Sequence, residues 1–179
     1  AEEEKKLPKP YVYATYFECD PTGEWRTDEI VETLIGPIYD AGVEDETIAG
    51  WGWMAHHTGG KWRRLLYRVS PSLEGLLDSM EKLDEKVSEK NEQASREVGR
   101  ICDTHEDYIW QQVAGSAGEE RGKAGFSMYL VCEMAREERA DEIVKTVLAP
   151  IYDKYVTEGK LDSWGWLSHV VGGKWRRLA

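Results

Sequence analysis

The stretch WGWMAHHTGGKWRRL at residues 51–65 returns as WGWLSHVVGGKWRRL at residues 164–178, with eleven of the fifteen positions identical. The same offset of 113 relates residues 11–65 to residues 124–178, where 25 of 55 positions are identical without a gap. Self-similarity at one fixed period indicates that a structural unit occurs twice along the chain. The order of helices and strands inside that unit therefore decides the fold.

Each half of the repeat begins with the pattern of a strand followed by a helix. Aromatic and β-branched residues over 11–19, and again over 125–133, predict strands. Apolar residues at helical spacing predict a helix over 25–42, with Thr27 as its N-cap. Pro37 and its equivalent Pro150 each remove an interior N–H, so both helices are expected to kink there.

The repeated stretch itself predicts a β-hairpin. The glycine pair 59–60 supplies the positive φ angles of a tight two-residue turn. That turn places Ala55 opposite Arg64 and His56 opposite Arg63.

The chain after the hairpin predicts one more helix and one more strand. Leucines at helical spacing from Leu73 onward predict the helix, with a break near Asn91, and residues 107–113 have the pattern of a strand. The first unit, residues 10–113, is therefore βαββαβ, the ferredoxin-like order of an α+β fold.

The remaining segments complete the predicted domain organisation. Residues 1–9 form an N-terminal tail, and the small polar residues 114–123 form a linker. The second unit, residues 124–179, is incomplete, because it ends after its third strand and has no counterpart of residues 66–113. Either the sequence stops short of the full unit or another chain completes its sheet, and the sequence does not choose between them.

Composition limits the classes of partner. The 179 residues have a net charge of −11 and a pI of about 4.9, which disfavours nucleic acid as a partner. No apolar run is long enough for a membrane span. The chain begins AEEEKKLPKP, without an initiator Met, which favours a mature secreted or periplasmic chain over a cytoplasmic one.

The three cysteines do not form a disulfide framework, because an odd number cannot pair completely. Cys19, Cys102 and Cys132 leave the redox compartment open, and the sequence does not say whether any two are bonded. If the second helix continued past residue 101, Cys102, His105 and Glu106 would share one helical face. A solvated helix end explains this spacing better than a metal site, so no metal site is predicted.

The tandem βαββαβ pattern with its aromatic central hairpin resembles the dimeric α/β-barrel superfamily. Its members include antibiotic-biosynthesis monooxygenase-like, NIPSNAP-like and EthD-like proteins, together with haem-handling branches. The resemblance implies tandem ferredoxin-like repeats, of which the second is incomplete. It also implies that these repeats form a dimeric α/β-barrel-like assembly, either as a homo-oligomer or by pairing with each other within one chain. It also implies a ligand site inside the barrel or between the sheet and its helices.

Strand alternation sorts the hairpin residues into two faces. One face has Trp51, Trp53 and Trp62, and we expect these tryptophans mainly to pack where two sheets meet. The other face has His56, which is retained in the repeat as His169, whereas His57 is not. His56 is therefore the better functional candidate of the two.

The predicted site residues come from both units. The candidate catalytic residues are His56, Tyr16 and Glu18. The candidate ligand-binding residues are Trp51, Trp53, Arg63, Tyr67, His169, Tyr129 and Arg176.

Two classes of function remain open from the sequence. The first is a small-molecule-binding or structural barrel protein, whose ligand would be small and apolar or aromatic. The second is an enzyme: a cofactor-independent monooxygenase or lyase with His56 or Glu18 as general base and Tyr16 as orienting group, or a haem-binding or haem-degrading protein with His56 or His169 as axial ligand. The haem-degrading branch of the superfamily uses an Asn, Trp and His set, from which this chain departs, because its single asparagine, Asn91, lies in the second predicted helix.

Overall fold

A computed structural model of the chain describes residues 9–117 and 124–179. Residues 1–8 of the predicted tail and residues 118–123 of the predicted linker lie outside the described residues. The chain divides into two compact units, Ala1–Ile109 (unit 1) and Trp110–Ala179 (unit 2). Within the described residues, no helix combines the length and apolarity that crossing a bilayer requires.

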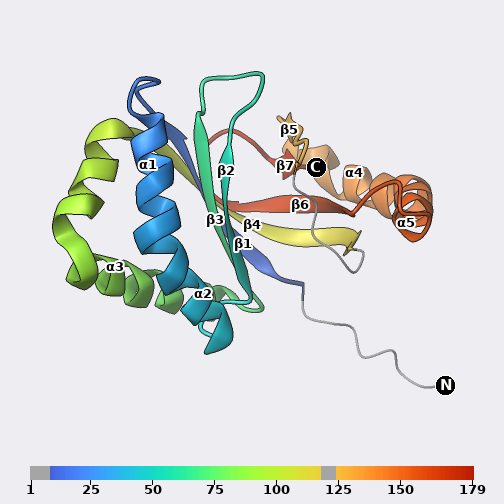
Figure 1. Ribbon diagram of the computed structural model, residues 1–179. Coiled ribbons are helices and arrows are strands. Elements are labelled where there is room, and N and C mark those ends of the chain that lie inside the picture. The colour runs from blue at the N-terminus through green and yellow to red at the C-terminus, as the bar shows by residue number, and fades with distance from the viewer. Residues whose placement is uncertain (1–8, 118–123) are drawn as a thin grey trace. The chain divides into compact units, whose positions relative to one another are not determined.

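Unit 1 has the predicted βαββαβ order, and its strands are arranged β2-β3-β1-β4, which is ferredoxin-like. Figure 1 shows the helices of unit 1 together on one side of its strands. The elements, including the π-helical turn η1, are β1 (Tyr11–Glu18), α1 (Glu24–Ile30), η1 (Val31–Ile35), α2 (Gly36–Glu44), β2 (Gly50–Ala55), β3 (Arg64–Ser70), α3 (Leu73–Ile101) and β4 (Thr104–Ala117).

Unit 2 repeats the first part of this order, and its strands are arranged β4-β6-β7-β5. Its helical segments α4, η3 and α5 begin and end 113 residues after α1, η1 and α2. The elements after β4 are β5 (Tyr129–Leu130), the 3₁₀ turn η2 (Met134–Arg136), α4 (Glu137–Ile143), η3 (Val144–Leu148), α5 (Ala149–Thr157), β6 (Ser163–Val171) and β7 (Arg177–Leu178).

The two prolines explain the π-helical turns. Pro37 lies in the first turn of α2, directly after η1, and Pro150 has the same place after η3. A proline ring cannot donate a hydrogen bond and collides with the carbonyl four residues earlier, which the wider π turn avoids. The predicted interruption is therefore present in both units, as a π turn within a continuous helical segment.

The hairpin has the predicted register. Ala55 pairs with Arg64, and the His56 amide donates to the Arg63 carbonyl at 2.9 Å. The φ angles of Gly59 and Gly60 are 86° and 61°, in the left-handed region that glycine tolerates.

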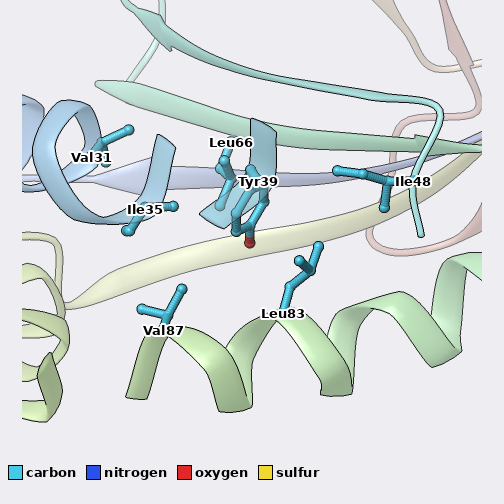
Figure 2. Packing of buried hydrophobic residues seen from close by; sticks show 7 residues of the cluster. All are labelled: Val31, Ile35, Tyr39, Ile48, Leu66, Leu83 and Val87. Carbon is cyan, nitrogen blue, oxygen red and sulfur yellow. The ribbon is translucent and has the colours of Figure 1, made fainter. Parts of the chain in front are cut away.

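The core of unit 1 lies between its sheet and its helices. Leu66 of β3 packs with apolar residues of η1, α2 and α3, as Figure 2 shows. The buried cluster consists of Val31, Ile35, Tyr39, Ile48, Leu66, Leu83 and Val87.

The long helix α3 is capped and kinked as its sequence suggests. Ser72 Oγ accepts the Gly75 amide at 3.0 Å, which caps the N-terminus. Asn91 has non-helical angles (φ −163°, ψ 89°), and its side-chain oxygen accepts the Ala94 amide at 3.0 Å. Asn91 therefore ends one helical segment and caps the next, which confirms the predicted break.

Several local predictions are wrong. Thr27 is not an N-cap, because α1 already begins at Glu24 and Thr27 lies fully buried inside it. The strand predicted over 125–133 is reduced to the two residues of β5. Strand β4 continues to Ala117, so residues 114–117 of the predicted linker belong to a strand.

Two of the three cysteines are bonded. Cys19 follows β1 and forms a disulfide with Cys102, the residue after α3, while Cys132 is a free thiol. The helical face proposed for Cys102, His105 and Glu106 does not exist, because the latter two lie in β4. Within residues 9–117 and 124–179, no group of three His, Cys, Asp or Glu side chains is arranged to hold a metal ion.

Candidate functional site

The repeated tryptophans and arginines bind two carboxylates on the first helix of unit 1. Glu24 and Asp28 lie one turn apart on α1 and face the hairpin. Arg64 donates from Nε and Nη2 to the two oxygens of Asp28, both at 2.7 Å, and from Nη1 to Glu24 at 3.2 Å. Arg63 donates to Glu24 from Nε at 2.5 Å and from Nη2 at 3.1 Å. The Trp53 indole N–H donates to Asp28 at 2.8 Å.

Unit 2 contains the same cluster. Arg177 donates from Nε at 2.7 Å and from Nη2 at 2.9 Å to Asp141, and from Nη1 to Glu137 at 3.1 Å. Arg176 donates from Nε to Glu137 at 2.6 Å, and Trp166 donates to Asp141 at 2.7 Å. We call the set in each unit the clamp: Glu24, Asp28, Trp53, Arg63 and Arg64 in unit 1, and Glu137, Asp141, Trp166, Arg176 and Arg177 in unit 2.

The carboxylates of the clamp are held in the ionised form. The hydrogen bond from Arg63 lowers the pKa of Glu24 below its ordinary value, and the Arg64 guanidinium lowers the pKa of Asp28. In unit 2 the hydrogen bond from Arg176 lowers the pKa of Glu137. Burial opposes each shift but is outweighed by the arginines. The oxygens of these groups are occupied by arginine and tryptophan donors, so the clamp joins helix to hairpin and is structural.

The position of the tryptophans corrects their predicted role. Trp51 donates to Asp40 of α2 at 2.9 Å and packs edge-on against Tyr39, with ring centroids 5.2 Å apart. Trp53 meets α1 through the clamp. Both side chains therefore lie on the sheet face that the helices cover, and not where two sheets meet. Their indole N–H groups are engaged by helix carboxylates.

Sequence reasoning did not identify the acidic half of the clamp. Glu24 recurs as Glu137 and Asp28 as Asp141 within the aligned repeat, at a spacing of four residues. Acidic residues retained at helical spacing, beside a retained pair of arginines, were the signal that could have indicated an ion-pair cluster.

The other face of the unit 1 sheet is not covered by any of the described helices of unit 1, and it contains predicted catalytic residues. Strand pairing places Tyr16, Leu65 and Met54 side by side on this face, and Tyr67 next to Ala14 and Gly52. We call it the open face, meaning free of helices of its own unit. His56 is the first residue after β2, and its amide donates to the Arg63 carbonyl at 2.9 Å.

Aromatic side chains meet at Tyr16. The Tyr16 ring lies 4.4 Å from the Trp62 ring and 5.7 Å from the Tyr108 ring, centroid to centroid, and Tyr16 is 2% exposed. The prediction that Trp62 shares a face with Trp51 and Trp53 is wrong. Regular pairing ends at Ala55 and Arg64, so strict alternation does not extend to residue 62.

His56 and His169 differ in the bonds of their rings. His169 Nδ1 lies 2.9 Å from Nη1 of Arg176. In unit 1, Arg63 directs Nε and Nη2 to Glu24, and the buried Nδ1 of His56 has no hydrogen-bond partner among the described residues. A buried nitrogen without a partner is costly, so Nδ1 of His56 needs a hydrogen-bond partner that the described residues do not supply.

The other predicted site residues have separate surroundings. Glu18 forms an ion pair with Lys61 at 2.6 Å, and Lys61 also contacts Glu106 at 2.8 Å. The carboxylate of Glu18 is engaged in an ion pair with Lys61, so His56 is the stronger candidate for a general base. In unit 2, Tyr129 lies 6.0 Å from the Trp175 ring, which repeats the contact between Tyr16 and Trp62 at a longer distance.

An open groove of about 490 Å³ lies between η1–α2 and α3. Its volume is within the range of ligand pockets, but no residue predicted from the sequence lines it. The lining residues are Thr33, Leu34, Pro37, Ile38, Ala41, Lys86, Glu89 and Lys90.

Comparison with known proteins supports the fold. No protein-family model matches the chain, and no curated protein sequence matches it significantly. A "putative monooxygenase" from Lactobacillus acidophilus NCFM is similar over 95% of this chain and 75% of that chain, with a TM-score of 0.61 and 8% identity. An anthrone oxidase-like protein is similar over 97% and 72%, with a TM-score of 0.49 and 13% identity. The similarity to the first of these structures, at 8% identity, concerns the fold alone, which is α+β and ferredoxin-like in unit 1.

Proposed function

We propose that this chain is a small-molecule-binding protein of the dimeric α/β-barrel superfamily, and that its ligand is a small aromatic molecule with a hydroxyl group. The observation that supports it most strongly is the buried Nδ1 of His56, which has no partner among the described residues. The fold similarity to a monooxygenase-like structure agrees with the antibiotic-biosynthesis monooxygenase-like branch.

The chemistry of the open face suits an aromatic hydroxyl compound. The His56 amide donates to the Arg63 carbonyl. Trp62, the residue before Arg63, stacks on Tyr16. Aromatic walls with a few placed polar groups are typical of small-molecule sites. A phenolic hydroxyl both donates and accepts, so it can pair with either tautomer of His56.

Calorimetric titration with 1-naphthol tests the proposal. We expect saturable binding that weakens by about tenfold or more in His56→Ala, which corresponds to the loss of one buried hydrogen bond. The same substitution at the exposed and unrepeated His57 is the matched control and should leave the affinity unchanged. 1-Methoxynaphthalene, which lacks the hydroxyl proton, should bind more weakly to the unsubstituted protein.

Two results would overturn the binding proposal. One is the absence of saturable heat with 1-naphthol. The other is equal affinity in the unsubstituted protein and in His56→Ala, provided that urea unfolding shows the variant to be folded.

A second candidate function is a cofactor-independent monooxygenase, favoured by the fold similarity together with a histidine suited to act as a base. His56 would accept the hydroxyl proton of 1-naphthol, and the naphtholate would react with O₂ at ring carbon 4. One oxygen atom would enter the ring and the other would leave as water, giving 1,4-naphthoquinone from 1-naphthol and O₂, with both electrons supplied by the substrate. Uptake of one O₂ per quinone, lost in His56→Ala, is the expected result. Binding of 1-naphthol without O₂ uptake would leave the binding function alone.

We also propose the domain organisation and location that the sequence suggests. The recurrence of α1, η1 and α2 at an offset of 113 supports a tandem pair of ferredoxin-like repeats, 10–113 and 124–179. The disulfide between Cys19 and Cys102 supports a periplasmic or secreted location, because such bonds persist in oxidising compartments. Alkylation of the protein in cells, before and after reduction, would show fully reduced thiols if this location is wrong.

A further inference from the structure

The groove between η1–α2 and α3 is separate from the open face of the sheet. Its lining residues all belong to unit 1 and come from η1, α2 and α3, which the structure describes in full. None of the candidate residues of the open face contributes to it. A ligand in this groove is therefore held independently of His56 and Tyr16.

The floor of the groove is apolar and continuous with the core. Leu34 of η1 and Ile38 of α2 are half-buried, because one side of each packs against the buried cluster of unit 1. Leu83 and Val87 of α3 point into that cluster, as Figure 2 shows. The other side of Leu34 and Ile38 lines the groove. An alkyl group in the groove removes this apolar surface from water, which is favourable.

The groove is long enough for an extended chain. On the side of η1 and α2 its lining begins at Thr33 and ends at Ala41. These positions are eight residues apart, which corresponds to about 12 Å along a helix. A medium-chain alkyl group, such as that of decanoate, has a similar length when it is extended. Because the groove is open, such a chain can lie down in it from the side.

Two lysines stand on the α3 side of the groove. Lys86 and Lys90 are one helical turn apart, so their Cβ atoms are about 5–6 Å from each other. Asp45 lies 3.6 Å from Lys86 Nζ, and within residues 9–117 and 124–179 no carboxylate lies within 4 Å of Lys90 Nζ. The two flexible side chains can therefore direct their ammonium groups to one carboxylate, while their stems cover an apolar tail.

The third charged residue of the groove limits the charge of its ligand. Glu89 also lies on the α3 side, and no ion pair joins it to either lysine in the described part of the chain. Two lysines and one glutamate leave a single net positive charge beside the apolar floor. That balance matches a monovalent carboxylate, whereas a phosphate dianion brings one negative charge too many.

We propose that this groove binds a medium-chain fatty acid. The alkyl chain lies on Leu34, Pro37 and Ile38, and the carboxylate lies between Lys86 and Lys90. The apolar floor and its length select the tail, and the charge balance of the rim selects the head group. This ligand and its site are distinct from the aromatic hydroxyl compound proposed for the open face.

Calorimetric titration of the full chain with decanoate, below its micelle-forming concentration, tests the proposal. We expect saturable binding. The affinity should rise by about twofold for each methylene group added between hexanoate and decanoate, because an open groove buries a methylene on one side only. Complete burial of each methylene would give about fourfold.

Substitutions in the groove identify the site. Ala41→Trp should abolish decanoate binding, because an indole at this exposed position fills the groove without disturbing the core. The charge reversal Lys86→Glu with Lys90→Glu should weaken binding by about tenfold or more. The matched control, Lys145→Glu with Lys174→Glu, changes the net charge equally at exposed positions of unit 2 and should leave the affinity unchanged.

Two further variants test the charge balance and the separation of the sites. Glu89→Gln removes the negative charge of the rim and should strengthen decanoate binding by about twofold or more. His56→Ala should leave the affinity for decanoate unchanged. Ala41→Trp should leave the affinity for 1-naphthol unchanged.

Any of three outcomes would overturn the proposal. The first is the absence of saturable heat with decanoate. The second is equal affinity in the unsubstituted chain and in Ala41→Trp, which would place the fatty acid elsewhere. The third is a dimer of the chain, detected by sedimentation, that Ala41→Trp dissociates, because a second copy would then be the natural occupant of the groove. None of these outcomes depends on 1-naphthol, so the two proposals fail independently.

Discussion

Replacing Arg64 by methionine tests the structural role of the clamp. The Arg64 side chain is 7% exposed and that of Glu24 is 10% exposed. Arg64→Met keeps the length and apolar stem of the side chain but removes both bonds to Asp28 and the bond to Glu24. Trp53 then still donates to Asp28 and Arg63 to Glu24, but part of the negative charge of the two carboxylates is left without a compensating positive charge.

The expected loss of stability is about 3 kcal/mol. Removing one member of a buried ion pair costs about 3–5 kcal/mol, because the remaining charge stays buried without compensation. The lower end applies because Asp28 is 40% exposed and keeps its bond from Trp53, while Glu24 keeps Arg63. With a urea m-value of about 2 kcal/mol/M, the unfolding midpoint should fall by about 1.5 M.

Urea unfolding followed by circular dichroism measures this midpoint. Arg64→Lys retains the charge but not the two-pronged geometry, so its loss should be intermediate. In the double variant Arg64→Met with Asp28→Asn, neutralising the carboxylate should make the total loss smaller than the sum of the two single losses. A midpoint change below about 0.5 M for Arg64→Met, or strict additivity, would show that the ion pairs contribute little.

Three further predictions concern stability. The pKa values of Glu24 and Glu137 in the folded protein are below the ordinary 4.5, so the stability that their ionised forms contribute is complete above pH 4.5 and is lost as the pH falls through the folded-state pKa values. Urea unfolding midpoints measured between pH 7 and pH 3 test this, and midpoints that do not change with pH would contradict it. Trp53→Phe replaces the indole by a smaller phenyl ring and removes the N–H bond to Asp28; the lost hydrogen bond alone should cost about 1 kcal/mol in the same assay. Reducing the disulfide between Cys19 and Cys102 should lower the free energy of unfolding by about 2–4 kcal/mol, because this bond closes a loop of 83 residues. The loss should be seen as a lower urea midpoint in the presence of reductant, and an unchanged midpoint would count against the bond.

Local patterns were sufficient for the order of the elements. The βαββαβ order, the hairpin register around Ala55 and Arg64, and the break at Asn91 each depend on residues close together in the chain. Side-chain periodicity and glycine turns report on such short-range structure directly. The repeat at an offset of 113 was likewise visible without coordinates.

The candidate site was predicted only in part. Alternation placed Tyr67 on one sheet face and Trp51 and Trp53 on the other, which agrees with the strand pairing; His56 lies just beyond the paired residues. Alternation does not say which face the helices cover. The tryptophan face was therefore assigned to packing between sheets, although it packs against helices.

The amino-acid sequence by itself determined the order of helices and strands in unit 1, the repeat, and the faces of the paired hairpin residues. Only the tertiary structure decided that Glu24 and Asp28 meet Arg63 and Arg64, and that Cys19 meets a cysteine 83 residues away. Those contacts join segments that are distant in the chain, and their formation depends on how helices pack on the sheet. Periodicity describes one segment at a time, so it contains no information about which distant side chain a given group will meet.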